Sequence, residues 1–186
     1  TAEECGGAIT ARAHFNSLVF STILEQAFGA VATTGPVSTY YTHAFTPTEE
    51  LPVGFTLEQG KGTGFMEVFE GCKVSKLTMS VAAQGLPLQW TADIIAETSG
   101  GPVSVGSPSQ IAAPVWIQSR HAMVFTWNSV SYTVKSVEIV IDNHLEMRPQ
   151  LGSLVTLEPC PGQLSEATVR VTLERMNSVL QTAYEA

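Results

Sequence analysis

The side chains that most often bind metals or transfer protons are scattered along this sequence. Its four histidines, His14, His43, His121 and His144, fall in different predicted elements. None of them pairs at i, i+4 with a carboxylate, as a zinc-binding helix requires. The sequence therefore predicts no metal site.

Glycines and potential nucleophiles also lack the spacing that chemistry needs. Gly60, Gly62 and Gly64 are not followed by Lys-Ser or Lys-Thr, and they precede a predicted strand instead of a helix N-terminus. No Gly-x-Ser-x-Gly elbow occurs, and Cys72, beside Gly71, has no recognisable histidine partner. We predict a flexible link at the glycines, no bound cofactor and no enzymatic activity.

Carboxylates are the remaining groups that could do acid–base chemistry as a pair. Asp93, Glu97, Glu138 and Glu174 occupy the polar positions of alternating patterns. Such groups more often form a solvated face of a sheet. The three cysteines, Cys5, Cys72 and Cys160, indicate reduced thiols, with a disulfide between Cys72 and Cys160 as the alternative.

The composition indicates a surface that meets other protein. Charged residues make up 14% of the 186 residues, against about 25% in an ordinary soluble domain. Depletion of Lys, Glu and Asp is typical of the centre of an oligomer interface, although a polar monomer is the simpler alternative. A net charge of −8 argues against tight nucleic-acid binding, and no stretch reaches the roughly 18 apolar residues of a membrane span.

The first part of the chain predicts a strand followed by a helix. Apolar and polar residues alternate from Ile9 to Phe15, which is typical of a half-buried strand. Asn16 then stands at the predicted N-cap, and apolar residues recur at helical spacing until Gly29 ends the helix. Because the chain starts at Thr1 instead of Met, we expect that an N-terminal piece was removed or left out.

Two long segments interrupt the regular patterns. Residues 30–54 are rich in Thr, Pro and Gly, and only Tyr40 to Phe45 predict a short strand. Because so long a connection in a compact domain is usually functional or disordered, we expect an arm or hairpin that touches a neighbouring molecule. Residues 98–114, rich in Gly, Ser and Pro, predict a second, flexible loop.

The remaining patterns are almost entirely those of strands. They cover 55–57, 65–69, 77–81, 88–96, 115–118, 123–127, 137–141, 155–158 and 167–173, and a short helix or arm is predicted at 176–184. We expect a single mainly β domain over residues 1–186. Its fold class is a β-sandwich or small barrel of about eight strands with one flanking α-helix and long loops.

The order of these features resembles the major tail tube proteins of long-tailed, siphovirus-type bacteriophages. After the first strand and helix, the blocks that carry the resemblance are Tyr41–Thr46, Phe55–Gly60, Glu70–Ser80, Leu88–Ile95 and Val137–Glu146. No block alone carries invariant chemistry, but together they span nearly the whole chain. The resemblance implies a structural subunit of the virion tail that is assembled in the host cytoplasm.

The resemblance also implies the partners. Six such domains, from six chains or three double-domain chains, would form a ring whose inner sheets join around a channel, and the rings would stack into a tube. The channel would hold the tape measure protein and pass double-stranded DNA without gripping it, and the tube would meet tail terminator and tail tip proteins. Joining sheets between subunits would also cover exposed strand edges.

Residue roles follow from this arrangement as expectations. Because Lys or Arg in the channel would attract phosphates, we expect an acidic lining in which some of Asp93, Glu97, Glu138 and Glu174 face the lumen. For contacts between rings, the expected residues all lie in the 30–54 segment: Tyr40, Tyr41, His43, Phe45, Glu49 and Glu50.

Other classes of protein remain as alternatives. A tail terminator or baseplate protein would share the β fold but form a single ring. A carbohydrate-binding β-sandwich would need exposed Trp90, Trp116 or Trp127 for stacking on sugars, whereas Trp90 and Trp127 fall on predicted apolar strand faces. An enzyme is disfavoured because nucleophile, metal and cofactor motifs are lacking.

Overall fold

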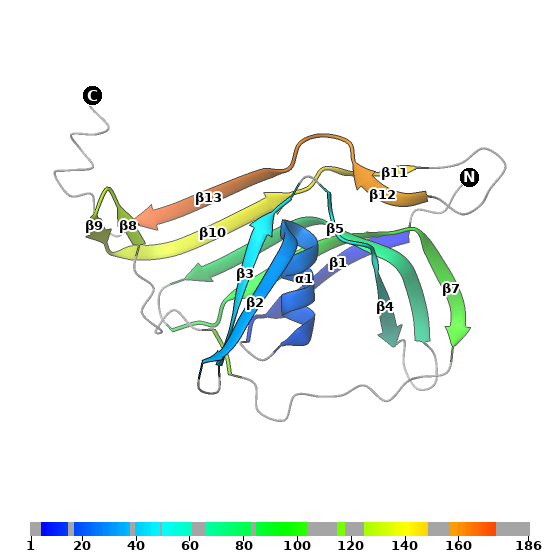
Figure 1. Cartoon of the computed structure of the whole chain (residues 1–186), viewed down its shortest axis with the longest axis horizontal. Coiled ribbons are helices and arrows are strands. Elements are labelled where there is room, and N and C mark those ends of the chain that lie inside the picture. Colours follow the sequence, from blue (N-terminus) through cyan, green and yellow to red (C-terminus); the bar gives the residue numbers. More distant parts are fainter. Residues whose placement is uncertain are drawn as a thin grey trace.

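The computed structural model describes residues 5–14, 17–37, 40–48, 50–60, 66–82, 85–103, 115–117, 125–148 and 157–173. Within these ranges it contains thirteen strands and one helix (Figure 1). The prediction of a mainly β fold with one flanking helix is therefore confirmed.

A long antiparallel sheet forms the centre of the molecule. Its strand order is β1 (Cys5–Arg12), β6 (Gln89–Ala96), β5 (Met66–Ala82), β10 (Val134–Asp142) and β13 (Glu166–Leu173). The sheet is open, with β1 at one edge and β13 at the other. Within the described chain it does not close into a barrel.

Strand β5 bends and carries a second group of strands. Its first half pairs with β4 (Phe55–Gly60) and with β7 (Thr98–Val103), whereas its second half pairs with β6 and β10. Between the halves, Gly71 has a φ of 63°, a conformation that favours glycine, and the register with β6 shifts between Val74 and Lys76. Figure 1 shows β4 and β7 descending steeply from the central sheet.

Helix α1 (Leu18–Phe28) packs on one face of this sheet. Ser17, one residue after the predicted Asn16, is the N-cap, because its hydroxyl accepts a hydrogen bond from the Phe20 N–H at 3.0 Å. Gly29 ends the helix with a φ of 111°, as predicted. The helix buries Phe20, Ile23 and Ala27, and the Phe20 ring stacks on Trp90 with ring centroids 5.9 Å apart.

Cross-strand register separates the two faces of the sheet. Trp90 lies opposite Ala11 and Met79, and Met79 lies opposite Ile139, so these residues share the face that packs against α1, here called the core face. The residues that alternate with these along each strand project their side chains to the opposite side of the sheet. That opposite side is here called the polar face.

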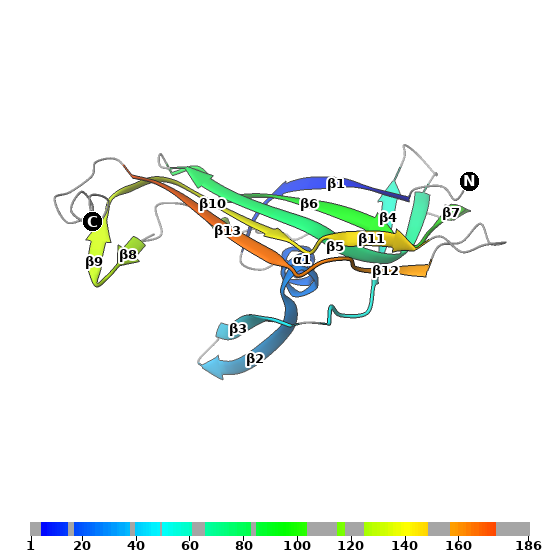
Figure 2. The same ribbon diagram turned by 90° about the horizontal axis from the view of Figure 1, so that it is seen from above.

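Three smaller sheets flank the centre. They are the hairpin of β2 (Gly29–Val37) and β3 (Tyr40–Pro47), the hairpin of β8 (Phe125–Trp127) and β9 (Val130–Tyr132), and the pair of β11 (Leu145–Arg148) and β12 (Leu157–Pro161). Figure 2 shows β2 and β3 projecting away from the central sheet on the side of α1.

Several sequence predictions of local structure were wrong. Residues 29–37 form a strand where none was expected, and Thr98–Val103 form a strand instead of the start of a loop. Strand β9 was not predicted. Of the strand expected at 115–118, residues 115–117 are described, and among these only Trp116 forms a β-bridge, with His14. The rest of the 98–114 loop and the helix or arm at 176–184 lie outside the described residues.

Candidate functional site

The polar face of the central sheet carries a regular array of hydrophilic side chains. A row of Thr10, Thr91, Thr78, Val140 and Thr168 crosses all five strands. The neighbouring row consists of Arg12, Gln89, Ser80, Glu138 and Arg170. Such a face presents small hydroxyl groups and a few charged groups to whatever lies in front of it.

Charges on this face are nearly balanced. Its carboxylates are Asp93, Glu138, Asp142 and Glu166, and its cations are Arg12, Lys76 and Arg170. Arg170 donates to Glu138 at 2.7 Å, and the Lys76 Nζ lies 3.7 Å from Asp142 Oδ2. We expected an acidic face because the sequence alone does not show that the strand order brings these cations beside the carboxylates.

The four carboxylates expected on the lumen side do not share one position. Asp93 is exposed and Glu138 is half-buried, and both lie on the polar face. Glu97 follows β6 at the bend, where its N–H donates to the Glu70 carbonyl and its side chain packs against Gly71. Glu174 lies outside the described residues.

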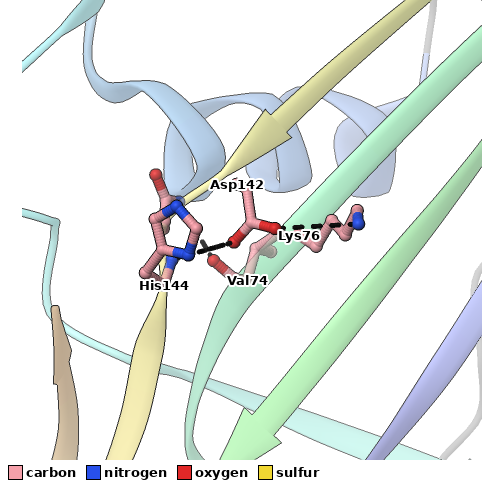
Figure 3. Close-up of polar contacts among 5 residues, drawn as sticks. Val74, Lys76, Asp142 and His144 are labelled. Carbon is pink, nitrogen blue, oxygen red and sulfur yellow. Dashed lines mark hydrogen bonds and ion pairs between the residues drawn. The ribbon is translucent and has the colours of Figure 1, made fainter. Parts of the chain in front are cut away.

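The turn Asp142-Asn143-His144 joins the sheet to the helix (Figure 3). Asn143 is 1% exposed, and its Nδ2 donates to the carbonyls of Ala27, at 3.2 Å, and Val74, at 3.1 Å. Lys76 and His144 lie on either side of the Asp142 carboxylate, as Figure 3 shows. The cluster therefore fixes the helix end and the β5 bend in place, a structural role that explains this characteristic block of the sequence.

A second polar contact ties three distant segments together. The Lys73 Nζ is 3.1 Å from Glu158 Oε1, which also accepts a hydrogen bond from the Gly54 N–H at 2.9 Å. The Gly54 hydrogen bond, followed by Lys73, lowers the pKa of Glu158 below its ordinary value. No local pattern could reveal this contact, since Gly54 and Glu158 are 104 residues apart.

The β2–β3 hairpin contains no Asp, Glu, Lys or Arg. Tyr41 and His43 are exposed, and His43 Nδ1 lies 2.9 Å from the Thr33 hydroxyl. Phe45 is half-buried against Phe28 at the base of the hairpin. Of the other residues expected here, Glu50 is exposed after the hairpin, Glu49 lies outside the described residues, and Tyr40 is described only as part of β3.

Both outer edges of the central sheet lack a partner strand within the described chain. Strand β1 pairs only with β6, and β13 pairs only with β10. Most of β13 is exposed, including Val169 at 59%. Unpaired edges of this length are sites where another chain can add a strand.

Other groups capable of chemistry have structural surroundings. Cys5, Cys72 and Cys160 are free thiols, and burial raises the pKa of Cys72 to about 11, so its thiol stays protonated at neutral pH. Trp90 is buried, and Trp116 packs edge-on against His14. Among the described residues, no group of three or more His, Cys, Asp or Glu is arranged to hold a metal ion, and no helix is long and apolar enough to span a membrane.

An open β-sheet with one polar face, two unpaired edges and an uncharged projecting hairpin defines a subunit built for β-rich assembly. The chain belongs to the phage tail tube protein family, whose model matches residues 1–182. It is a structural subunit of a viral tail, and it assembles with its own copies and with other tail components. No curated protein matches the chain.

Proposed function

We propose that this subunit forms rings of six chains in which the central sheets join edge to edge and the polar face lines the channel. The observation that carries the proposal is the pair of open edges, β1 and β13, on a sheet that has one apolar and one hydrophilic face. Head-to-tail contact between unlike edges gives a closed ring when the rotations from each subunit to the next add up to a full turn. Such closure leaves no exposed edge.

The strand order predicts the direction of the seam. Each of the five strands is antiparallel to its neighbour, so β1, β5 and β13 run the same way. A rotation about the channel axis keeps that direction from subunit to subunit. The seam between β13 of one subunit and β1 of the next is therefore a parallel pair.

The polar face suits a channel for double-stranded DNA and for the tape measure protein. Exposed Arg and Lys would attract phosphates and add salt-dependent affinity. Here Arg170 and Lys76 each have a carboxylate beside them. The negative charge of that carboxylate weakens the attraction of each cation for the phosphates of passing DNA. We retain Asp93 and Glu138 as lumen-facing residues and Glu97 as a candidate at the margin of this face. Glu174, which lies outside the described residues, stays a candidate from the sequence alone.

The hairpin is proposed to connect successive rings. It projects from the side of the sheet that bears the helix (Figure 2), and its exposed side chains include Tyr41 and His43. Because it carries no charge, stacking it against a neighbouring ring removes no ionic group from water. Tail terminator and tail tip proteins would then meet the two ends of the stack, and assembly would take place in the host cytoplasm.

Mass measurement of the purified subunit tests the ring. Native mass spectrometry and light scattering over a wide concentration range should show six-chain rings and stacks of them. A strict monomer at high concentration, under every salt condition, would contradict the proposed ring.

A further inference from the structure

A mainly apolar groove of about 420 Å³ lies at the β1 edge of the sheet, between β1 and β4. Its apolar lining includes Ile9, Leu57, Phe69, Ile94 and Ala96. Its polar lining includes Thr10 of β1 and Glu58 and Gln59 of β4, and Gly6 and Gly7 also border it. The groove thus continues the core face of the sheet out to an edge that has no neighbouring strand in the described chain.

The two glycines of this edge differ in what surrounds them. A Cβ added to Gly6 would lie 2.5 Å from the Ile94 carbonyl oxygen, so a side chain there is excluded by the subunit's own packing. A Cβ added to Gly7 would meet no atom within 4 Å. Gly7 pairs with Ile94 and borders the groove, so its missing side chain leaves open space that the isolated subunit does not use.

Strand β13 carries a row of apolar side chains on the same face at the opposite edge. The row is Ala167, Val169, Val171 and Leu173, in register with the core-face residues of β10. Val169 is 59% exposed although its cross-strand neighbour Ile139 packs against the core. A parallel seam continues the core face from one subunit into the next, and it brings this row to the mouth of the groove.

We propose that the groove is the docking site for β13 of the next copy of this chain, and that Gly7 keeps it open for the apolar side chains of that strand. The proposal rests on the ring described above and adds its specific contact. Because the groove and the β13 row lie at opposite edges of one molecule, every subunit offers one of each, as a head-to-tail ring requires.

Two variants and their mixture test this contact. Gly7→Val fills the groove, and Val169→Asp places a charge in the apolar row, whereas Ala82→Val adds volume at an exposed position on the polar side of the central strand β5, outside the groove lining, as a control. Gly7→Val and Val169→Asp should each stay monomeric with a wild-type circular dichroism spectrum, and Ala82→Val should assemble. Mixing the two variants restores one intact contact per pair, so native mass spectrometry should show 1:1 dimers that grow no further.

The possible results separate this contact from the ring itself. Six-chain rings from both single variants would refute the groove contact but not the proposed ring. Failure of the wild-type chain to form rings would refute the proposed ring itself. If Gly7→Val loses its folded spectrum, Val169→Asp decides alone, because Val169 is exposed in the subunit. Normal rings from Val169→Asp then refute the proposal.

Discussion

At the scale of single residues, the polar side chains of this subunit divide into those that hold the fold and those that face outward. Asn143, Lys73 and Glu158 belong to the first group, since each bonds segments far apart in the sequence. Asp93, Glu138 and Arg170 belong to the second.

Asn143 should be a strong stability determinant. Asn143→Ala removes two buried hydrogen bonds and leaves the carbonyls of Ala27 and Val74 without this donor. We expect the free energy of unfolding to fall by about 2–4 kcal/mol, measured by urea denaturation. Thr56→Ala, an exposed change on β4, should have little effect. Equal stability of the two variants would show that Asn143 does not fix the helix end.

The contact at Glu158 should make stability depend on pH. Because the folded-state pKa of Glu158 is lowered, its contribution is present above its unfolded-state value of 4.5 and is lost as pH falls through the folded-state pKa. Glu158→Gln should therefore lose less stability than the wild type between pH 7 and pH 3.5. Lys73→Met keeps the Gly54 hydrogen bond, so it should flatten the profile only in part. Parallel profiles for all three proteins would contradict this assignment.

The carboxylate of Glu138 should reduce attraction between the channel and DNA. Glu138→Gln leaves Arg170 without its partner at 2.7 Å. Phage carrying this change should still assemble tails but eject DNA more slowly in low salt, because the freed Arg170 can bind a phosphate. Each phosphate that a cation neutralises makes the logarithm of the binding constant fall more steeply with the logarithm of the salt concentration, by about 0.9 in slope. Adding Arg170→Gln should restore the parental rate, and Asp93→Lys should slow ejection in the same way. Parental rates in all variants would place these residues away from the DNA path.

At the scale of elements, the sequence predicted best where one side of a segment is buried. Helix α1 and strands β6 and β10 have clear periodicity because one face of each packs into the core. Strand β13 also alternates, although most of it is exposed in the subunit. The N-cap was displaced by one residue because Asn16 and Ser17 are both capping residues. Strand β2 was missed because its residues from Ala32 to Pro36 are exposed, with Gly35 and Pro36 inside it, so no alternation marks it.

Strand β7 and the charge pairs show what local patterns cannot contain. Gly100, Gly101 and Pro102 are typical of a loop, yet pairing with the long β5 strand makes this segment a strand. The carboxylates of the polar face could be predicted from alternation alone. The cations Arg12 and Arg170 also stand at polar positions of alternating strands, but their pairing could not be predicted, because Arg170 reaches Glu138 only through the order of the strands. Local patterns therefore predict which side chains share a face, but not which of them pair.

The β2–β3 hairpin should be required for stacking but not for folding. Replacing the segment from Thr33 to His43 by Asn-Gly joins the paired residues Ala32 and Ala44 through a two-residue turn. It keeps the contact of Phe45 with Phe28 and the Thr48 N–H bond to the Phe28 carbonyl. The shortened protein should unfold at nearly the wild-type temperature and form rings without tubes in electron micrographs. Tubes of normal length would mean that other segments connect the rings.

At the scale of the whole molecule, the composition acquires a physical explanation. In the proposed tube, two sheet edges and one hairpin of each subunit contact its own copies and need few charged residues, which agrees with the 14% charged fraction. The net charge of −8 would then disfavour tight binding of the DNA that the proposed channel passes.

Cryo-electron microscopy of assembled tubes would show whether the polar face of the sheet lines the channel. The map should show the row of Thr10, Thr91 and Thr78 facing the lumen, α1 on the outside of the sheet, and a parallel seam between β13 and β1 of adjacent subunits. A lumen lined by α1 or by the β2–β3 hairpin, or a ring closed without β1 and β13, would contradict this account.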